Sequence, residues 1–188
     1  MKPNIGQGDK GKTRLLGGGS ECNKDDPQVE AYGTIDELNS VVGIVRAHIA
    51  AQEIDEILAR VQEDLFCIEA HTSAGRGYEE YPKLPAFGEE RVKFLEECIL
   101  EWEKEVPPLQ NFILPGGTPS AAFCDLARTV SRRAERRMST WLRTTKETPA
   151  RKAGYAYINR LSDFFFALER KLNHDAGEKE NPWIVKSK

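Results

Sequence analysis

Apolar residues recur at helical spacing, three and four positions apart, in five separate segments of the 188-residue chain. The clearest segment follows Pro119, where one side of a helix collects a continuous apolar stripe: Phe123, Leu126, Ala127, Val130, Ala134, Met138 and Trp141. The other four cover residues 28–49, 54–73, 89–105 and 149–175. No segment shows convincing strand alternation, and prolines or glycines separate the helices. The sequence therefore predicts an all-α fold, a five-helix up-and-down bundle forming a single domain.

Composition and charge narrow the class of protein. Charged residues make up 30% of the chain and hydrophobic residues 39%, which is typical of a soluble globular domain. No run reaches the roughly 18 apolar residues of a membrane span, and the first residues carry neither a signal core nor a transit pattern, so we expect a cytoplasmic protein. A net charge of −3 argues against a dedicated nucleic-acid binder.

The four cysteines are scattered and lack C-x-x-C spacing, so we expect reduced and mostly buried thiols rather than zinc ligands or disulfides: Cys22, Cys67, Cys98 and Cys124.

The N-terminal residues 1–27 are rich in glycine and have no regular periodicity. Residues Gly6–Thr13 match the Walker A pattern G-x-x-x-x-G-K-[ST], but a P-loop needs a buried strand before it and a helix after it. Only five residues precede the pattern, and the Gly17–Gly19 run cannot continue a helix. We therefore do not expect a P-loop fold. A loop that contacts phosphates through backbone N–H groups and Thr13 or Lys12 remains open, as does a flexible tail.

Basic residues are concentrated along the segment after Pro119. Arg128, Arg132 and Arg136 recur every four residues on the side opposite the apolar stripe. Stacked like charges repel along a helix, so an anion is expected to face them. Guanidinium groups suit phosphate geometry. A solvated basic face is the equally weighted alternative.

Other candidates are single residues. Asp36 lies mid-helix, where aspartate is unfavourable, and Arg128 is its natural partner, within or between subunits. Asn159 and Phe166 share a helix face, and Phe112 precedes a Pro-Gly-Gly turn. Each aromatic could contact a ligand or simply pack against other side chains.

The sequence contains no recognisable protein nucleophile constellation. The histidines are widely spaced, and we interpret His48 and His71 as structural or surface residues. No His/carboxylate spacing resembles a di-iron site, and no metal ligands are assigned. If the chain is an enzyme, a bound reactant supplies the difficult chemistry.

Six stretches, in order, resemble the ATP:cob(I)alamin (corrinoid) adenosyltransferases of the propanediol-utilisation (PduO) type. They are Gly8–Thr13, Lys24–Asp26, Val29–Ser40, Phe112–Gly117, Ala127–Arg136 and Tyr157–Asp163. The resemblance implies a ferritin-like helical bundle that assembles as a trimer, with an N-terminal ATP-binding segment at 1–27 and the catalytic bundle at 28–188. It also implies transfer of the 5′-deoxyadenosyl group from ATP to cob(I)alamin at a site between subunits, with Mg²⁺ assisting and triphosphate leaving.

The same resemblance implies the roles of individual residues. ATP binding falls on the N-terminal loop, the arginine helix and the fifth helix, and the wall against cobalamin is aromatic. The residues implied for ATP are Ile5, Gly6, Gln7, Gly8, Thr13, Lys24, Arg132, Arg133, Glu135, Arg136 and Asn159. Asp36 and Arg128 are implied as an intersubunit pair, and Phe112 and Phe166 as the wall that displaces the lower axial ligand. A cobalamin reductase and an adenosylcobalamin-dependent enzyme are implied as partners.

Two departures from the family pattern bear on these roles. The family's Tyr-Thr-Lys-x-Gly-Asp start reads Asn-Ile-Gly-Gln-Gly-Asp here, so Ile5 replaces a hydroxyl residue. The C-terminus is short, and Trp183 could substitute for the family's closing aromatic residue. A non-catalytic ATP- or corrinoid-binding sensor or delivery module therefore remains the main alternative. A nucleic-acid binder, with strongly salt-dependent affinity, is a weaker one.

Overall fold

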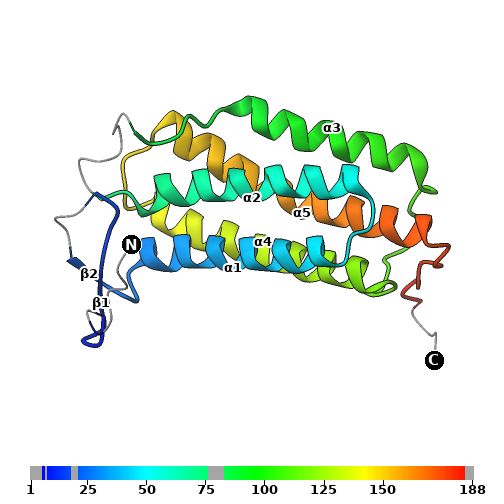
Figure 1. Cartoon of the computed structure of the whole chain (residues 1–188), viewed down its shortest axis with the longest axis horizontal. Coiled ribbons are helices and arrows are strands. Elements are labelled where there is room, and N and C mark those ends of the chain that lie inside the picture. Colours follow the sequence, from blue (N-terminus) through cyan, green and yellow to red (C-terminus); the bar gives the residue numbers. More distant parts are fainter. Residues whose placement is uncertain (1–5, 7, 18–20, 76–82, 185–188) are drawn as a thin grey trace.

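The fold was analysed in a computed structural model, which describes residues 6, 8–17, 21–75 and 83–184. It contains five long helices: α1 Pro27–Ala47, α2 Gln52–Ser73, α3 Glu89–Glu105, α4 Pro119–Leu142 and α5 Pro149–Asp175. Consecutive helices run in opposite directions along one bundle (Figure 1). The predicted five-helix up-and-down bundle is therefore confirmed.

Three helices begin with the same local device, an oxygen-bearing cap followed by proline. Asp26 caps α1 by accepting the Gln28 N–H at 2.9 Å. Thr118 caps α4 and Thr148 caps α5 in the same way, each accepting an N–H at 3.2 Å. Proline has no backbone N–H, but this costs nothing at the first helical position, because an N–H there has no partner within the helix. These caps fix where α1, α4 and α5 start.

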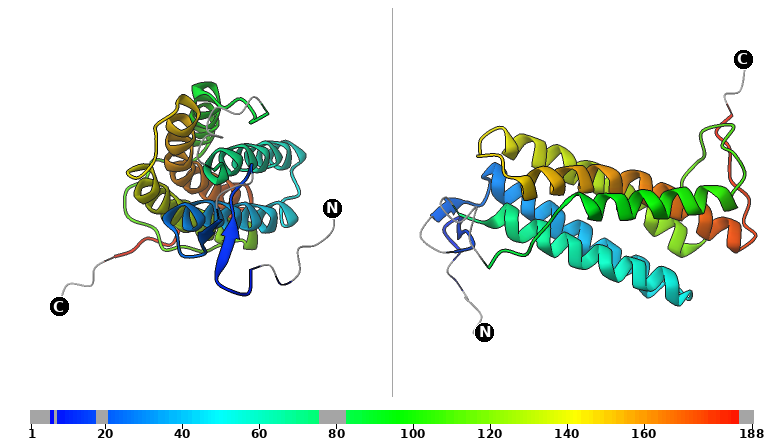
Figure 2. Two further views of the ribbon diagram at one scale, coloured as in Figure 1. Left: turned by 90° about the vertical axis from the view of Figure 1, so that its left-hand side faces the viewer. Right: turned by 90° about the horizontal axis from the view of Figure 1, so that it is seen from above.

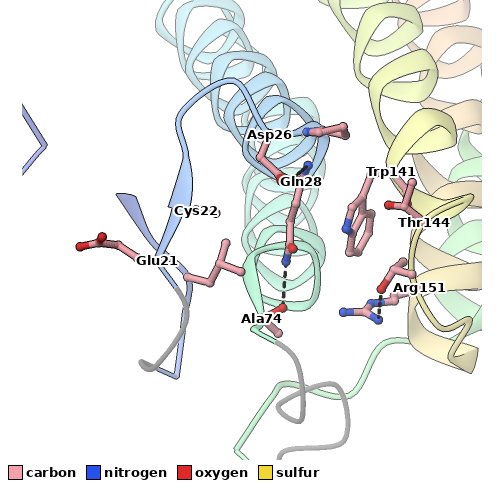
Figure 3. A pocket seen from close by; sticks show the side chains of 11 residues that line it. Glu21, Cys22, Asp26, Gln28, Ala74, Trp141, Thr144 and Arg151 are labelled. Atoms are coloured by element: carbon pink, nitrogen blue, oxygen red, sulfur yellow. Dashed lines mark hydrogen bonds between the residues drawn. The ribbon is translucent and has the colours of Figure 1, made fainter. Parts of the chain in front are cut away.

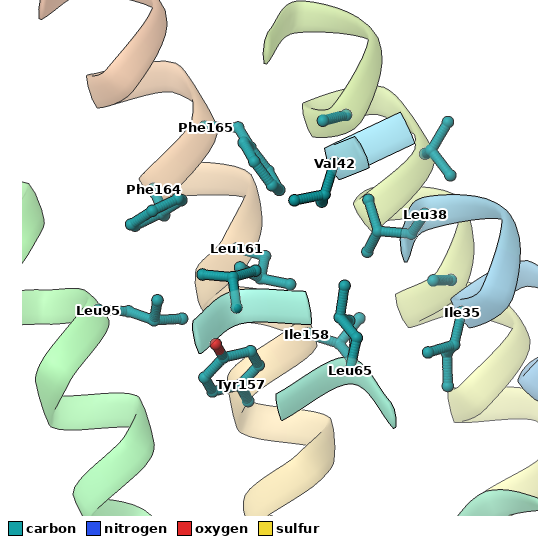
Figure 4. Close-up of a cluster of buried hydrophobic side chains, with 14 of the residues drawn as sticks. Ile35, Leu38, Val42, Leu65, Leu95, Tyr157, Ile158, Leu161, Phe164 and Phe165 are labelled. Carbon is teal, nitrogen blue, oxygen red and sulfur yellow. The ribbon is translucent and has the colours of Figure 1, made fainter. Parts of the chain in front are cut away.

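The helices close around one apolar core. Helix α1 packs against α2 and α4, while α5 packs against α4 and α3. End-on and side views show the helices arranged around a shared centre, with β1 and β2 at one end of the bundle and the end of α5 at the other (Figure 2). Side chains from four helices meet in that centre (Figure 4), and each of the following is fully buried: Ile35, Leu38, Leu65, Leu95, Ile158 and Phe165. Burying each such side chain contributes roughly 1.5–3 kcal/mol.

A short β-hairpin lies at the N-terminal end of the bundle. Strand β1 Lys12–Arg14 pairs antiparallel with β2 Glu21–Asn23. Beyond β1, Leu16 exchanges backbone hydrogen bonds with the chain after α2, at 2.9 Å to Ser73 O and 3.0 Å from Gly75 N. The expectation of no strands was wrong here, because three-residue strands are too short to show alternation. The Walker-like pattern runs into strand β1, as expected for a chain without a P-loop.

Two further details differ from expectation. Leu126, assigned to the apolar stripe of α4, is 43% exposed. All four cysteines are free, but only Cys124 is buried, and the other three are half-buried. Burial raises the pKa of Cys98 to about 11 and that of Cys124 further, which keeps both thiols protonated and unreactive.

Histidine positions agree with a structural or surface role. His71 is buried and its Nε2 lies 2.7 Å from Pro85 O, whereas His48 and His174 are exposed. Among the described residues, no helix is both long and apolar enough to cross a bilayer.

Candidate functional site

The arginines of α4 divide into paired and unpaired residues. Arg133 reaches Glu37 on α1 at 2.5 Å, and Arg137 reaches Glu30 on α1 at 3.4 Å. These two arginines therefore join α4 to α1. Arg133, expected to bind ATP, is thus already engaged with a carboxylate within the chain.

Arg132 and Arg136 remain exposed on the outer side of the same helix. Within the described part of the chain neither has a carboxylate partner. Arg136 Nη1 donates to the Arg132 carbonyl at 2.9 Å, which places one guanidinium against the turn that carries the other. Two solvent-facing guanidiniums one turn apart repel each other unless an anion lies between them.

A carboxylate–amide pair lies beside these arginines. Asn159 Nδ2 on α5 donates to Glu135 Oε1 on α4 at 2.9 Å. Arg132, Arg136, Glu135 and Asn159, four of the predicted site residues, therefore share one surface formed by α4 and α5. This surface offers cations, an amide and a carboxylate, the groups that would contact the phosphates and the polar edges of a nucleotide.

The hairpin brings together three of the residues expected to hold phosphates. Lys24 N donates to Gly11 O at 2.9 Å, and Gly11 N donates to Gly8 O at 3.1 Å. A Cβ atom on Gly8 would lie 2.9 Å from Lys24 Nζ, so the lysine head lies directly over the Gly8 backbone. Thr13 pairs with Cys22 across the hairpin.

Of the remaining loop residues, Gly6 is exposed with a φ of +81°, a conformation that favours glycine. Ile5 and Gln7 lie outside the described residues.

Asp36 and Arg128 do not pair within the chain. Arg128 Nε instead binds Asp125 at 3.2 Å. Asp36 is exposed on α1 beside Glu69 of α2. Burial raises the pKa of the Glu69 carboxyl and Asp36 raises it further, and Glu69 Oε2 is buried without a hydrogen-bond partner among the described residues. The face formed by α1 and α2 thus carries two adjacent carboxyl groups for which no cation is described.

A cavity separates the hairpin from the ends of α4 and α5 (Figure 3). It measures about 440 Å³ and is mostly polar in its lining, which includes Gln28, Trp141 and Arg151. Gln28 Nε2 donates to Thr72 O and Ala74 O, both at 2.8 Å. Arg151 is 2% exposed and lies over the Trp141 ring at 4.8 Å. The sequence did not identify Gln28 or Arg151 as lining residues, because nothing in the helical pattern distinguishes these two polar positions from surface positions.

An apolar cavity opens at the opposite end of the bundle. It measures about 510 Å³ and is lined by Leu109, Gln110, Asn111, Phe112, Trp183 and Ile184. Trp183 N donates to Phe112 O at 2.7 Å, and Leu114 N donates to Asn181 O at 2.8 Å. Phe112 is 77% exposed and Trp183 54% exposed. Large apolar side chains left in water at one place mark a binding surface, and Trp183 lies beside Phe112 in this cavity.

Phe166 lines a different groove. It lies between α3 and α5 with Ile99 and Leu100, in a space of about 440 Å³. Within the described part of a single chain, Phe112 and Phe166 line separate cavities. Asn159 and Phe166 do occur on the same outward face of α5, as their spacing predicted.

Comparison with known proteins gives consistent matches. Residues 4–172 match the family model described as cobalamin adenosyltransferase. A corrinoid adenosyltransferase of Bacillus subtilis is 40% identical over 183 residues, covering 94% of this chain and 89% of that protein. The corrinoid adenosyltransferase PduO of Citrobacter freundii is 37% identical over 169 residues, covering 90% of this chain and 49% of that protein, so this chain spans about half of PduO.

Solved structures give the same result. A variant of the PduO-type ATP:corrinoid adenosyltransferase from Lactobacillus reuteri, complexed with cobalamin and ATP, superposes with a TM-score of 0.87 at 34% identity, covering 95% of this chain and 97% of that chain. A second variant, complexed with ATP, gives a TM-score of 0.84 at the same identity, covering 95% and 98%.

Proposed function

The chain belongs to the cobalamin adenosyltransferase family and is a corrinoid adenosyltransferase, and we propose how its own residues carry out that reaction. The enzyme transfers the 5′-deoxyadenosyl group of ATP to cob(I)alamin and releases triphosphate. Cobalt(I) attacks C5′ of ATP, a Co–C bond forms, and the C5′–O bond breaks with its electron pair leaving on the triphosphate. Cobalt is therefore the nucleophile, which is consistent with a chain in which no protein nucleophile was recognised.

The observation that carries this proposal is the pair of arginines beside Glu135–Asn159 for which the described residues supply no carboxylate partner. Arg132 and Arg136 would hold the triphosphate and stabilise the charge that grows on it as the bond breaks. Glu135 and Asn159 would contact the nucleoside. Gly8, Thr13 and Lys24 would supply further contacts to the phosphates from a hairpin at the same end of the bundle as the C-terminus of α4.

The corrin would lie at the other end of α4. Arg132 is 14 residues beyond Thr118, or about 21 Å along the helix axis at 1.5 Å per residue, and the Phe112 loop leads directly into Thr118. In this arrangement the phosphates of ATP would point toward the hairpin end and the corrin would lie against the aromatic wall at the other end. The transferred C5′ carbon would lie between them. Phe112 and Trp183 would form an apolar floor that excludes a lower axial ligand from cobalt, and Phe166 would extend it.

We propose that the site is completed by another copy of the chain, in a homotrimer. Asp36 and Glu69 form a carboxyl pair that lacks a described cation, while Arg128, Arg132 and Arg136 form a cationic row on a different face. Docking the acidic face of one copy on the basic face of the next would pair Asp36 with Arg128 and bring the hairpin close to the arginine row.

Mg²⁺ is proposed as the companion of ATP. No group of three histidine, cysteine, aspartate or glutamate side chains that could hold a metal occurs in the described ranges. The ion would therefore be held mainly by phosphate oxygens and water, as is usual for magnesium. Its chemistry would be to neutralise the departing triphosphate.

Three wider assignments belong to the same proposal. Cob(I)alamin needs an electron donor, so a cobalamin reductase is an expected partner. An adenosylcobalamin-dependent enzyme would take the product, and the reaction would take place in the cytoplasm.

The test is adenosylation of prereduced cobalamin with ATP, followed through the absorbance of cob(I)alamin and adenosylcobalamin. The wild-type chain should form adenosylcobalamin, and Arg132→Ala should lose most of the rate. Arg143→Ala, which removes an exposed arginine just after the same helix, serves as the matched control. ATP and corrinoid binding without turnover would instead support the sensor or delivery module.

A further inference from the structure

Asn173 is a buried amide near the end of α5, and it is 5% exposed. Its Oδ1 accepts the Thr118 N–H at 2.9 Å. Its Nδ2 donates to Gly116 O at 3.0 Å and to Glu169 Oε1 at 2.8 Å. The amide therefore uses its acceptor and both of its N–H donors.

This arrangement permits only one orientation of the amide. Reversing it would set the NH₂ group against the Thr118 N–H and the oxygen against the oxygens of Gly116 and Glu169. Three hydrogen bonds, each wholly or partly buried, would then be lost at once. Glu169, one turn earlier on α5, thus fixes the direction in which Asn173 presents its amide to the loop.

The loop is shaped to receive the amide. Gly117 has a φ of +95°, a conformation that side-chain-bearing residues rarely adopt. A Cβ atom on Gly117 would lie 2.1 Å from Asn173 Oδ1. The Asn173 amide can therefore approach the loop this closely only because Gly117 has no side chain.

The backbone of Asn173 holds a second segment. Asn173 O accepts the Glu178 N–H at 2.9 Å, just beyond the end of α5. The chain from Glu178 then reaches Asn181 and Trp183, which bond to the backbone of residues 112–114. Both segments that line the 510 Å³ apolar cavity are therefore attached at the same residue.

We propose that Asn173 is a positioning residue for the corrin-facing wall, holding the Phe112 loop through its side chain and the Trp183 segment through its backbone. The inference rests on the proposed role of that wall in binding the corrin. Packing alone cannot fix these aromatics, since Phe112 and Trp183 are mostly exposed. Hydrogen bonds to Asn173 supply the missing constraint, so the wall is formed before the corrin arrives.

The first test needs no turnover. Asn173→Ala should speed amide hydrogen exchange in peptides covering 112–118 and leave the peptides of α1 and α2 unchanged, because only the loop loses its anchor. His174→Ala, an exposed change on the next residue, is the control. Exchange in 112–118 equal to that of the wild type would overturn the inference.

The second test separates positioning from general damage. Asn173→Ala should lower the rate starting from cob(II)alamin with a reductant by at least about tenfold, which corresponds to 1.4 kcal/mol, and lower the rate from prereduced cob(I)alamin much less. In Asn173→Ala, electron paramagnetic resonance of bound cob(II)alamin should show that the lower axial nitrogen ligand stays on cobalt. Equal losses in both assays would refute a positioning role.

A second variant tests the same contact in case Asn173→Ala folds poorly. Gly117→Ala disturbs the same contact from the loop side, and Gly11→Ala, in the hairpin at the opposite end of the bundle, is its matched control, with a φ of +73° and nothing within 4 Å of the added Cβ. Gly117→Ala should reproduce the Asn173→Ala result, and identical behaviour of the two glycine variants would count against the inference. A wild-type chain that makes no adenosylcobalamin would refute the proposed function instead, while the exchange result still decides the role of Asn173.

Discussion

Replacing Glu169 by glutamine should stabilise the protein at alkaline pH and change little at acid pH. Glu169 is 3% exposed on α5. The pKa of its carboxyl is raised from 4.5 to about 7, chiefly by burial and to a smaller extent by Asp125 on α4 and Glu180 after α5, while Asn173 and Arg170 oppose the rise. Glutamine keeps an oxygen for Asn173 and removes the charge.

The size of the effect follows from the two pKa values. The folded chain keeps the Glu169 proton between pH 4.5 and about 7, whereas the unfolded chain has lost it. The folded state therefore binds more protons in this window, and its stability falls as the pH rises through it. At about 1.4 kcal/mol for each unit of pKa, the buried charge costs about 3 kcal/mol above pH 7.

Urea unfolding at a fixed protein concentration, repeated from pH 4.5 to 8.5, measures this cost. The concentration must be fixed because an oligomer's stability depends on it. The gain from Glu169→Gln should be small at pH 4.5, increase through pH 6 and level off near 3 kcal/mol by pH 8. Glu178→Gln, at an exposed position near the same end of the bundle, should show no such trend. A difference between Glu169→Gln and the wild type that stays constant with pH would refute the reasoning.

Three further changes probe the site and the fold. Arg132→Ala should lower kcat at least about 10²-fold, as the loss of a donor to developing charge does elsewhere, and near-normal kcat would remove Arg132 from the triphosphate site. Phe112→Ala should impair adenosylation from cob(II)alamin more than from prereduced cob(I)alamin, and equal losses would contradict the axial-ligand argument. Arg151→Met should lower the free energy of unfolding by about 2–4 kcal/mol, because buried acceptors lose their donor, and an unchanged urea midpoint would contradict this.

The helices were predictable because each carries its signals locally. The bounds expected for α3 and α5, 89–105 and 149–175, coincide with those in the structure. Pro149 and the Pro107–Pro108 pair stop or start a helix whatever its surroundings. The hairpin was not predictable, because strands of three residues show no periodicity and their pairing depends on a turn between them.

Residues whose role depends on three-dimensional neighbours were also missed. Asn173 and Glu169 fall in a helical segment where a polar residue is usually solvated, and only the fold shows that both are buried. Trp183 had no assigned place, since its position beside Phe112 is set by backbone pairing between segments about 70 residues apart. The row of Arg128, Arg132 and Arg136 was identified from spacing. Arg133 was added to the ATP-binding residues by the family resemblance alone, and only the fold shows that it pairs with Glu37.

The charges on α1 explain why a partner for Asp36 should be sought outside the chain. Helices α1 and α4 pack together, yet the contact uses Glu37 and Arg133. Asp36 is the residue before Glu37, so its side chain points about 100° away around the helix. It lies beside Glu69 of α2 instead, while Arg128 binds Asp125 on its own helix. Two neighbouring carboxyl groups repel unless a cation joins them, and in the proposed trimer the exposed arginines of a second copy would supply that cation.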